Sequence, residues 1–183
     1  QNSFTQNQST NGDHKSIGSN VFYKYYDKVK NKIFDVNLGV NYYNEESNNE
    51  FILSQEIAPV SSGSKIVSDN QNRNYYLKLD YTQPFEKSGI NLEMGGKIDF
   101  KNNVIPNDYY LLNQNNWNLD HSKSNRFQYL ENLNSVYTNV SKTFFKKLEA
   151  RIGLRYEYIH YKIMQNVGSI EKTNSYGTWL PDI

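Results

Sequence analysis

Charged residues at alternate positions are the feature of this sequence best suited to chemistry. Glu149, Arg151, Arg155 and Glu157 follow one another in a single short segment. Side chains two positions apart lie on the same face of an extended strand, so these residues can form ion pairs along it. Glu131 and Glu157 could instead form the carboxylate pair of a glycoside hydrolase. Because both also fit a ladder of charges along a strand face, we favour the ladder.

Other residues that could hold a metal or cofactor lack the spacing such sites need. The sequence has no cysteine and no nucleotide-binding or nucleophile motif. The stretch from Asp69 through Gln71 and Arg73 to Asp80 resembles a calcium loop only loosely, because the sixth-position glycine and final glutamate are missing. Three histidines in three separate segments do not predict a metal site: His14, His121 and His160. We therefore expect no catalytic residue, no metal and no cofactor.

Composition narrows the class of protein. The chain has 183 residues with 20 basic and 19 acidic side chains, so it lacks the basic excess of a nucleic-acid-binding protein. Only 37% of its residues are hydrophobic, yet 15% are aromatic. Disordered chains are poor in aromatic residues, so disorder does not explain the low hydrophobic content. No apolar run approaches the roughly 18 residues of a membrane helix. The apolar residues must instead be used efficiently in part of the chain.

Strict alternation of apolar and polar residues predicts β-strands rather than helices. The pattern is clear in four segments: Ile33–Tyr43, Asn74–Phe85, Ile90–Phe100 and Glu149–Tyr158. It is weaker in three others: Asn20–Lys28, Phe127–Phe144 and Ser175–Ile183. In the second of these, apolar residues fall on odd positions early and even positions late, and a β-bulge would reconcile the two halves.

The predicted connections alternate in length. Short turns are expected near Val29–Lys32, Glu86–Gly89 and Phe145–Lys147. Long polar segments are expected at residues 44–73, 101–125 and 165–174, the first with an extra strand or strand extension around Phe51–Ile57. This arrangement predicts an up-and-down antiparallel sheet with two unlike ends.

Two architectures share this pattern: a soluble sheet or lipocalin-like barrel, and a transmembrane β-barrel with its apolar face outward. Strands of about 10–11 residues tilted by about 40° rise about 25–28 Å, close to the apolar band of an outer-membrane barrel. Tyrosines near the strand ends and the unlike connections also favour the membrane barrel. We therefore predict an all-β fold, an up-and-down antiparallel transmembrane β-barrel present as a partial set of about seven strands.

This orientation assigns each alternating residue to one face. The residues expected to face lipid are Val36, Leu38, Leu77, Leu79, Leu92, Ile98, Ile152 and Leu154. Those expected to face the lumen are Lys78, Asp80, Glu93, Lys97, Arg151, Arg155 and Glu157. An ordinary solvated sheet face is the alternative for the charged set.

Seven strands do not close a bacterial barrel, whose strand number is even and at least about eight. An open edge in lipid would leave backbone groups unpaired at several kcal/mol each. We therefore expect residues 1–18 to form a polar N-terminal segment or loop and residues 19–183 a partial barrel, with its plug and remaining strands outside this sequence.

Several segments together resemble the outer-membrane β-barrel family related to TonB-dependent receptors. The resemblance covers roughly residues 19–182 and rests on YYLKLDYTQPF (75–85), RFQYLENLNSVYTNV (126–140), LEARIGLRYEY (148–158) and SYGTWLPD (175–182). Leu133 stands where the family usually has Ile, and Trp179–Asp182 where Phe-Pro-Ser is typical. Nothing in the sequence resembles a plug domain, a TonB box or the family's terminal strand.

The resemblance implies a place in the bacterial outer membrane and a role in importing a nutrient or other ligand. The implied partners are outer-membrane lipid, the remaining strands and plug of the same protein, TonB through parts outside this sequence, and an unknown ligand. Two functions remain open: part of a transport barrel, or a structural or interaction sheet without transport activity. No residue pattern supports an enzyme.

Overall fold

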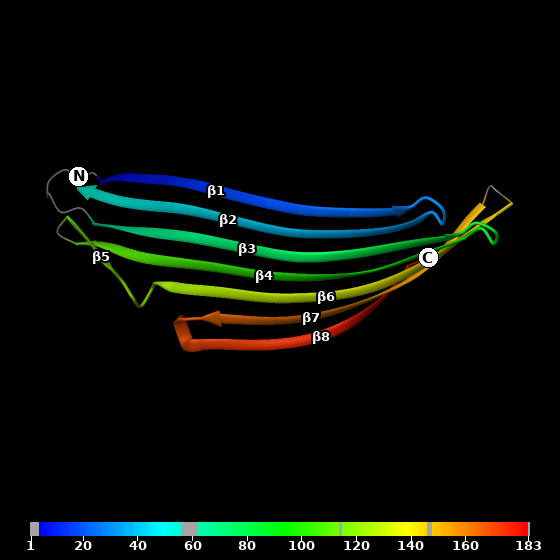
Figure 1. The fold of residues 1–183 in the computed structure, drawn as a ribbon. Helices are drawn as coiled ribbons and strands as arrows, with labels where there is room; N and C mark the ends of the chain where they lie inside the picture. The colour runs from blue at the N-terminus through cyan, green and yellow to red at the C-terminus, as the bar shows by residue number, and fades with distance from the viewer. Residues whose placement is uncertain (1–3, 56–61, 114, 146–147, 183) are drawn as a thin grey trace.

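The computed structural model describes residues 4–55, 62–113, 115–145 and 148–182. These residues form one antiparallel sheet in a single curved layer (Figure 1). Along the sheet the strands follow the order β1-β2-β3-β4-β6-β7-β8, with the short β5 paired to the end of β4. The strands are β1 (Phe4–Asp27), β2 (Lys32–Gln55), β3 (Ser62–Phe85), β4 (Ile90–Asn113), β5 (Asn116–Leu119), β6 (Asn125–Phe144), β7 (Leu148–Gln165) and β8 (Ile170–Asp182), with a 3-10 turn, η1, at Val167–Ser169.

The predicted fold class is confirmed. All seven predicted strands lie in the sheet, neighbours in sequence pair as antiparallel strands, and the eighth strand is the four-residue β5. Among the described residues, β1 and β8 each pair on one side only, so the sheet is open. No helix in the described part is long and apolar enough to cross a membrane.

The long polar segments are strands, not the loops expected from their composition. β2 continues to Gln55 and β3 begins at Ser62, so most of the stretch from Asn44 to Arg73 is paired; residues 56 and 57 of the expected extra strand lie outside the described part. β4 likewise extends to Asn113. The expected polar N-terminal segment lies in β1 from Phe4 onward. Polar side chains are compatible with strands here because the backbone ladder itself satisfies the amide groups.

The bulge expected in β6 is absent. β6 keeps one continuous register with β4, from Ile90 opposite Lys142 to Asn107 opposite Asn125, and another with β7. The apolar residues of β6 therefore lie on both faces: Val136 and Val140 on one, Phe127 and Leu133 on the other. The change of phase marks a change in the surroundings along the strand, not an inserted residue.

The three hairpin turns at one end of the sheet are displaced from one another by the same amount along the strand direction. β3 ends two residues beyond the position opposite the start of β2, and β6 ends two residues beyond the position opposite the start of β4. Because each displacement of two residues is spread over two strands, neighbouring strands are offset by one residue. One residue of about 3.4 Å per strand spacing of about 4.8 Å corresponds to a tilt of about 35°, at the lower limit of the roughly 35–45° of outer-membrane barrels.

The sheet has no apolar core of its own. No hydrophobic residue among those described is buried; Ile152, for example, is 63% exposed and Leu154 43%. The buried polar residues are Asn44, Ser68, Asp99 and Ser135. A single-layer sheet of this kind needs an apolar environment that covers its apolar face.

Candidate functional site: the two faces of the sheet

The eight apolar residues predicted to share a face do so. Opposite partners in an antiparallel pair point to the same side, and the register places Leu38 opposite Leu77 and Leu77 opposite Ile98. Leu92 is connected to Ile152 through Val140 of β6. Alternation within each strand then places the rest on the same side: Val36, Leu79 and Leu154.

The apolar part of this face has a similar length in three strands. It runs from Phe34 to Tyr42 in β2, from Ile90 to Phe100 in β4 and from Leu148 to Tyr158 in β7. Eight to ten residue steps of about 3.4 Å, at a tilt of about 35°, rise about 22–28 Å. This is close to the roughly 25 Å apolar band of outer-membrane barrels.

Aromatic residues form a row along the upper limit of this band, at the end away from the hairpin turns. With the offset of one residue per strand, aromatic side chains lie at a common level in five strands. They are Tyr42, Tyr75, Phe100, Tyr158 and Trp179. Tyrosine and tryptophan prefer the boundary between lipid and water, because the ring is apolar and its polar group stays wet.

Polar side chains begin directly above the aromatic row. On the same face, Arg73 lies above Tyr75, and its guanidinium carbon is 5.8 Å from the centre of the Tyr42 ring. Asn44 donates to Asp69 Oδ1, and Gln71 Nε2 donates to Asp69 Oδ2 at 3.0 Å. The apolar band therefore ends abruptly.

The seven predicted charged residues share the opposite face. Lys78 lies opposite Lys97, and Lys97 opposite Ser135, which in turn lies opposite Glu157. Asp80, Glu93, Arg151 and Arg155 follow from the alternation of their strands. The charges lie at the same levels as the apolar band on the other side of the sheet.

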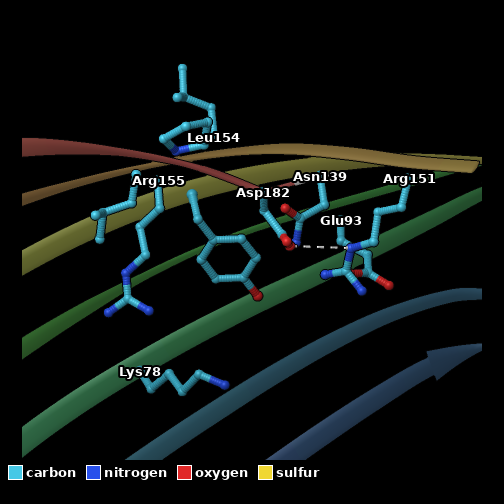
Figure 2. Close-up of a pocket in the computed structure, with 10 residues that line it drawn as sticks. Lys78, Glu93, Asn139, Arg151, Leu154, Arg155 and Asp182 are labelled. Carbon is cyan, nitrogen blue, oxygen red and sulfur yellow. Dashed lines mark hydrogen bonds and ion pairs between the residues drawn. The ribbon is translucent and has the colours of Figure 1, made fainter.

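An open pocket of about 460 Å³ lies on the charged face near the hairpin end (Figure 2). Arg151 is its central cation: Nη2 lies 3.3 Å from Glu93 Oε2, and Nε lies 3.8 Å from Asp182 Oδ2. Lys78 and Arg155 line the same pocket. Among the further lining residues, Tyr137 and Asn139 could not be predicted from the sequence, because the mixed phase of β6 concealed which face their odd positions occupy.

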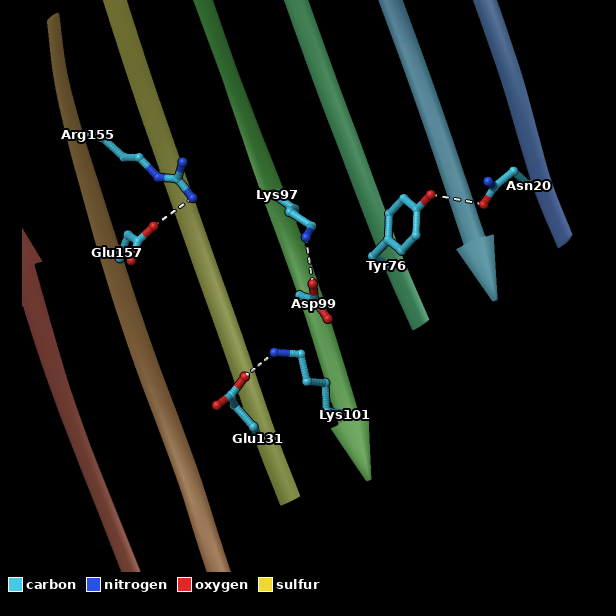
Figure 3. Close-up of polar contacts among 8 residues, drawn as sticks. All are labelled: Asn20, Tyr76, Lys97, Asp99, Lys101, Glu131, Arg155 and Glu157. Carbon is cyan, nitrogen blue, oxygen red and sulfur yellow. Dashed lines mark hydrogen bonds and ion pairs between the residues drawn. The ribbon is translucent and has the colours of Figure 1, made fainter. Parts of the chain in front are cut away.

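Ion pairs form a ladder along this face (Figure 3). Arg155 Nη2 lies 2.6 Å from Glu157 Oε1, and the expected pairing of these two residues is present. Four further pairs occupy the same face: Lys24–Asp35 at 3.7 Å, Lys78–Asp80 at 2.8 Å, Lys97–Asp99 at 2.6 Å and Lys101–Glu131 at 2.8 Å. The ladder is nearly balanced in charge, which suits a water-lined wall.

Close packing of tyrosine against glycine accompanies the ladder. Tyr76 lies opposite Gly39, and a Cβ added to Gly39 would overlap the ring of Tyr76. The Tyr76 hydroxyl donates to Asn20 Oδ1 at 2.9 Å (Figure 3). The ring thus crosses β2 over the glycine and links three strands, an arrangement known to stabilise glycines in sheets.

The other candidate residues do not come together. Asp69 and Asp80 lie on opposite faces of β3, so the loosely calcium-like stretch cannot surround an ion. Glu131 and Glu157 lie four ladder positions apart, about 14 Å, too far for a hydrolytic pair. No group of three His, Asp or Glu side chains in the described part could hold a metal ion. His160 instead contacts Ser175, with 2.7 Å between Nδ1 and Oγ.

A turn at the opposite end of the sheet from the hairpin turns connects β5 to β6. Asp120 Oδ1 accepts hydrogen bonds from the Ser122 hydroxyl at 2.6 Å and the Ser122 backbone amide at 3.0 Å. The hydroxyl hydrogen bond holds the pKa of the Asp120 carboxyl below its ordinary value.

A tilted antiparallel sheet with an apolar band on one face and charges on the other is the wall of an outer-membrane β-barrel. The chain belongs to the outer membrane protein beta-barrel family, whose model matches residues 24–183. Membership places the protein in the bacterial outer membrane. A comparison with curated proteins gave no match.

The fold is similar to part of a solved TonB-dependent receptor, and a second solved receptor gives a weaker match. The ferric citrate transporter FecA in its unliganded form is 14% identical, with a TM-score of 0.50 over 82% of this chain and 24% of that one. The ferric preacinetobactin receptor BauA of Acinetobacter baumannii is 12% identical, with a TM-score of 0.41 over 81% of this chain and 27% of that one. The chain therefore spans about a quarter of the length of either receptor.

Proposed function

We propose that this chain forms part of the barrel wall of a receptor related to TonB-dependent receptors, which imports a nutrient or other ligand. In this role the eight apolar residues face lipid and the seven charged residues face an aqueous lumen. The proposal rests on the relative position of two features: the ion-pair ladder lies on the opposite face of the sheet at the same level as the apolar band. A barrel wall between lipid and water needs an apolar outer face and a polar inner face at the same level.

Closure of the barrel requires more strands. β1 and β8 each offer an unpaired edge, and a backbone edge in lipid costs several kcal/mol for each unsatisfied group. In the proposed receptor, residues 19–183 are a partial barrel, and further strands of the same protein pair with both edges. A plug of that protein would contact the charged face, and TonB would act through it.

The family and the resemblance to receptors favour a role without catalysis. The ladder supports this reading, because each carboxylate of the rejected hydrolytic pair already has a cation: Lys101 for Glu131 and Arg155 for Glu157. Import is therefore a matter of binding and passage.

Growth of the source bacterium tests the import role. A strain without this gene and a strain without TonB are compared on a panel of sole iron and carbon sources. We expect the first strain to fail on a subset of the nutrients on which the second fails, and the wild-type gene to restore growth. If the first strain grows like its parent on every nutrient while the wild-type protein resides in the outer membrane, the barrel has a structural role instead.

A further inference from the structure

The apolar face is not smooth: it contains a groove inside the band. The groove has a volume of about 370 Å³ and is almost wholly apolar in its lining. Gly96 of β4 and Val136 of β6 form its floor, and it is bounded by Leu77 and Leu79 of β3 on one side and Tyr156 and Tyr158 of β7 on the other. The depression exists because Gly96 has no side chain where neighbouring strands carry large ones.

The aromatic row is interrupted directly above this groove. β4 contributes Phe100 to the row and β7 contributes Tyr158, but β6, which lies between them, has Asn134 at that level. Asn134 lies opposite Ile98 and Tyr158 and lines the groove. A carboxamide on a lipid-facing surface is expensive, and such polar groups are normally functional.

The amide of Asn134 retains donor capacity. Asn134 Nδ2 donates to Asn132 Oδ1 at 3.2 Å, and a carboxamide NH₂ carries two hydrogens. Its level is that of the boundary between acyl chains and headgroups, where lipid ester and amide carbonyls accept hydrogen bonds.

From the apolar groove, the gap in the aromatic row and the Asn134 amide, we propose that this face holds one acyl chain of a membrane lipid at a defined site. The chain lies over Gly96 against Val136 and Tyr156, and its carbonyl accepts a hydrogen bond from Asn134. The band level fixes the occupant as a lipid, because at this depth acyl chains are the medium that an outward-facing groove meets. This inference rests on the proposed orientation of the apolar face.

Photo-crosslinking tests the site. The purified full-length receptor is placed in phosphatidylethanolamine–phosphatidylglycerol vesicles with a trace of phosphatidylethanolamine whose acyl chain carries a diazirine, and labelled peptides are identified by mass spectrometry. We expect labelling at Val136 and Tyr156 to exceed that at Leu38 and Val40, on the same face at similar depth, by about tenfold, the ratio given by a preference of about 1.4 kcal/mol. Equal labelling would overturn the site.

Variants separate the site from the general lipid face. Gly96→Leu fills the groove and should reduce the labelling at Val136 and Tyr156 to the level of Leu38, since a Cβ there meets only Ser135 O at 3.3 Å and Val136 Cγ1 at 3.7 Å. Thr138→Leu, on the same face of β6 outside the groove, should leave it unchanged. Asn134→Leu should lower the excess labelling at Val136 and Tyr156 several-fold. Unchanged labelling in this variant would contradict the role assigned to the Asn134 amide.

The remaining outcomes are equally decisive. Absence of label at both Val136 and Leu38 would contradict the orientation of the apolar face itself, and with it the proposed function. Protection of Val136 together with covalent dimers formed by a bifunctional reagent would show a second copy in the groove and overturn the lipid site.

Discussion

Tyr137 of β6 lies across Gly95 of β4 and reaches β3. Its hydroxyl donates to Asp80 Oδ1 at 2.5 Å, and a Cβ on Gly95 would lie 2.5 Å from the Tyr137 ring and 2.6 Å from the backbone oxygen of Leu79. The absence of a side chain at Gly95 thus lets Tyr137 cross β4 on the charged face.

Gly95→Ala should therefore destabilise the folded protein. The added methyl group displaces Tyr137 and meets backbone that cannot move independently, which costs about 1–3 kcal/mol. Urea unfolding of the full-length protein in detergent measures the change in the free energy of unfolding. Gly96→Ala is the matched control, because its Cβ would meet nothing nearer than 3.3 Å. Equal effects of the two substitutions would contradict the assigned packing.

Leu154→Arg should block assembly into the membrane. Leu154 is 43% exposed in the apolar band, and a cation near the bilayer midplane costs about 2–4 kcal/mol. The measurement is the fraction of protein recovered in outer-membrane extracts after expression. Normal recovery of the variant would show that this face does not meet lipid.

Glu157→Gln should leave assembly intact. Glu157 lies three positions along the same strand, on the opposite face, and its ion pair with Arg155 is partly exposed. Partly exposed pairs contribute about 0.2–1 kcal/mol. The same extract assay should give wild-type recovery, and a loss as large as that of Leu154→Arg would contradict the assignment of this face to water.

Trp179 should lie at the lipid boundary. The chain has two tryptophans, so Trp117→Phe leaves Trp179 as the only one in this segment; any tryptophan elsewhere in the protein is also replaced. We expect lipids brominated high on the acyl chain to quench its fluorescence more than lipids brominated near the chain end, with little quenching by aqueous iodide. Strong iodide quenching would remove Trp179 from the aromatic row.

Within the apolar band, the strands could be predicted from the sequence. A strand with one face in lipid must be apolar at every second position, and the residues from Phe34 to Tyr42 show this alternation. Above the band both faces carry mostly polar side chains, so the sequence shows no alternation there. Residues from Asn44 to Gln55 form a strand because their backbone pairs with β1 and, up to Leu53, with β3, a cause that the residue types do not show.

The ambiguous phase of β6 has the same origin. Val136 and Val140 lie within the band on the apolar face, whereas Leu133 lies on the charged face level with the aromatic row. A sequence gives no marker of the height at which lipid ends, so the mixed pattern suggested a bulge. Partners across strands also need the register: Lys101 and Glu131 are 30 positions apart in sequence and only 2.8 Å apart in space.

The orientation of the two faces is tested most directly by spin labels along β7. The chain contains no cysteine, so single cysteines at positions 150–158 can be labelled one at a time in the full-length receptor, once any cysteine elsewhere in it is replaced. We predict that collision with oxygen peaks at even positions such as Leu154, and collision with a water-soluble nickel chelate peaks at odd positions such as Arg155. The opposite phase, or no alternation, would contradict an apolar face toward lipid and a charged face toward water.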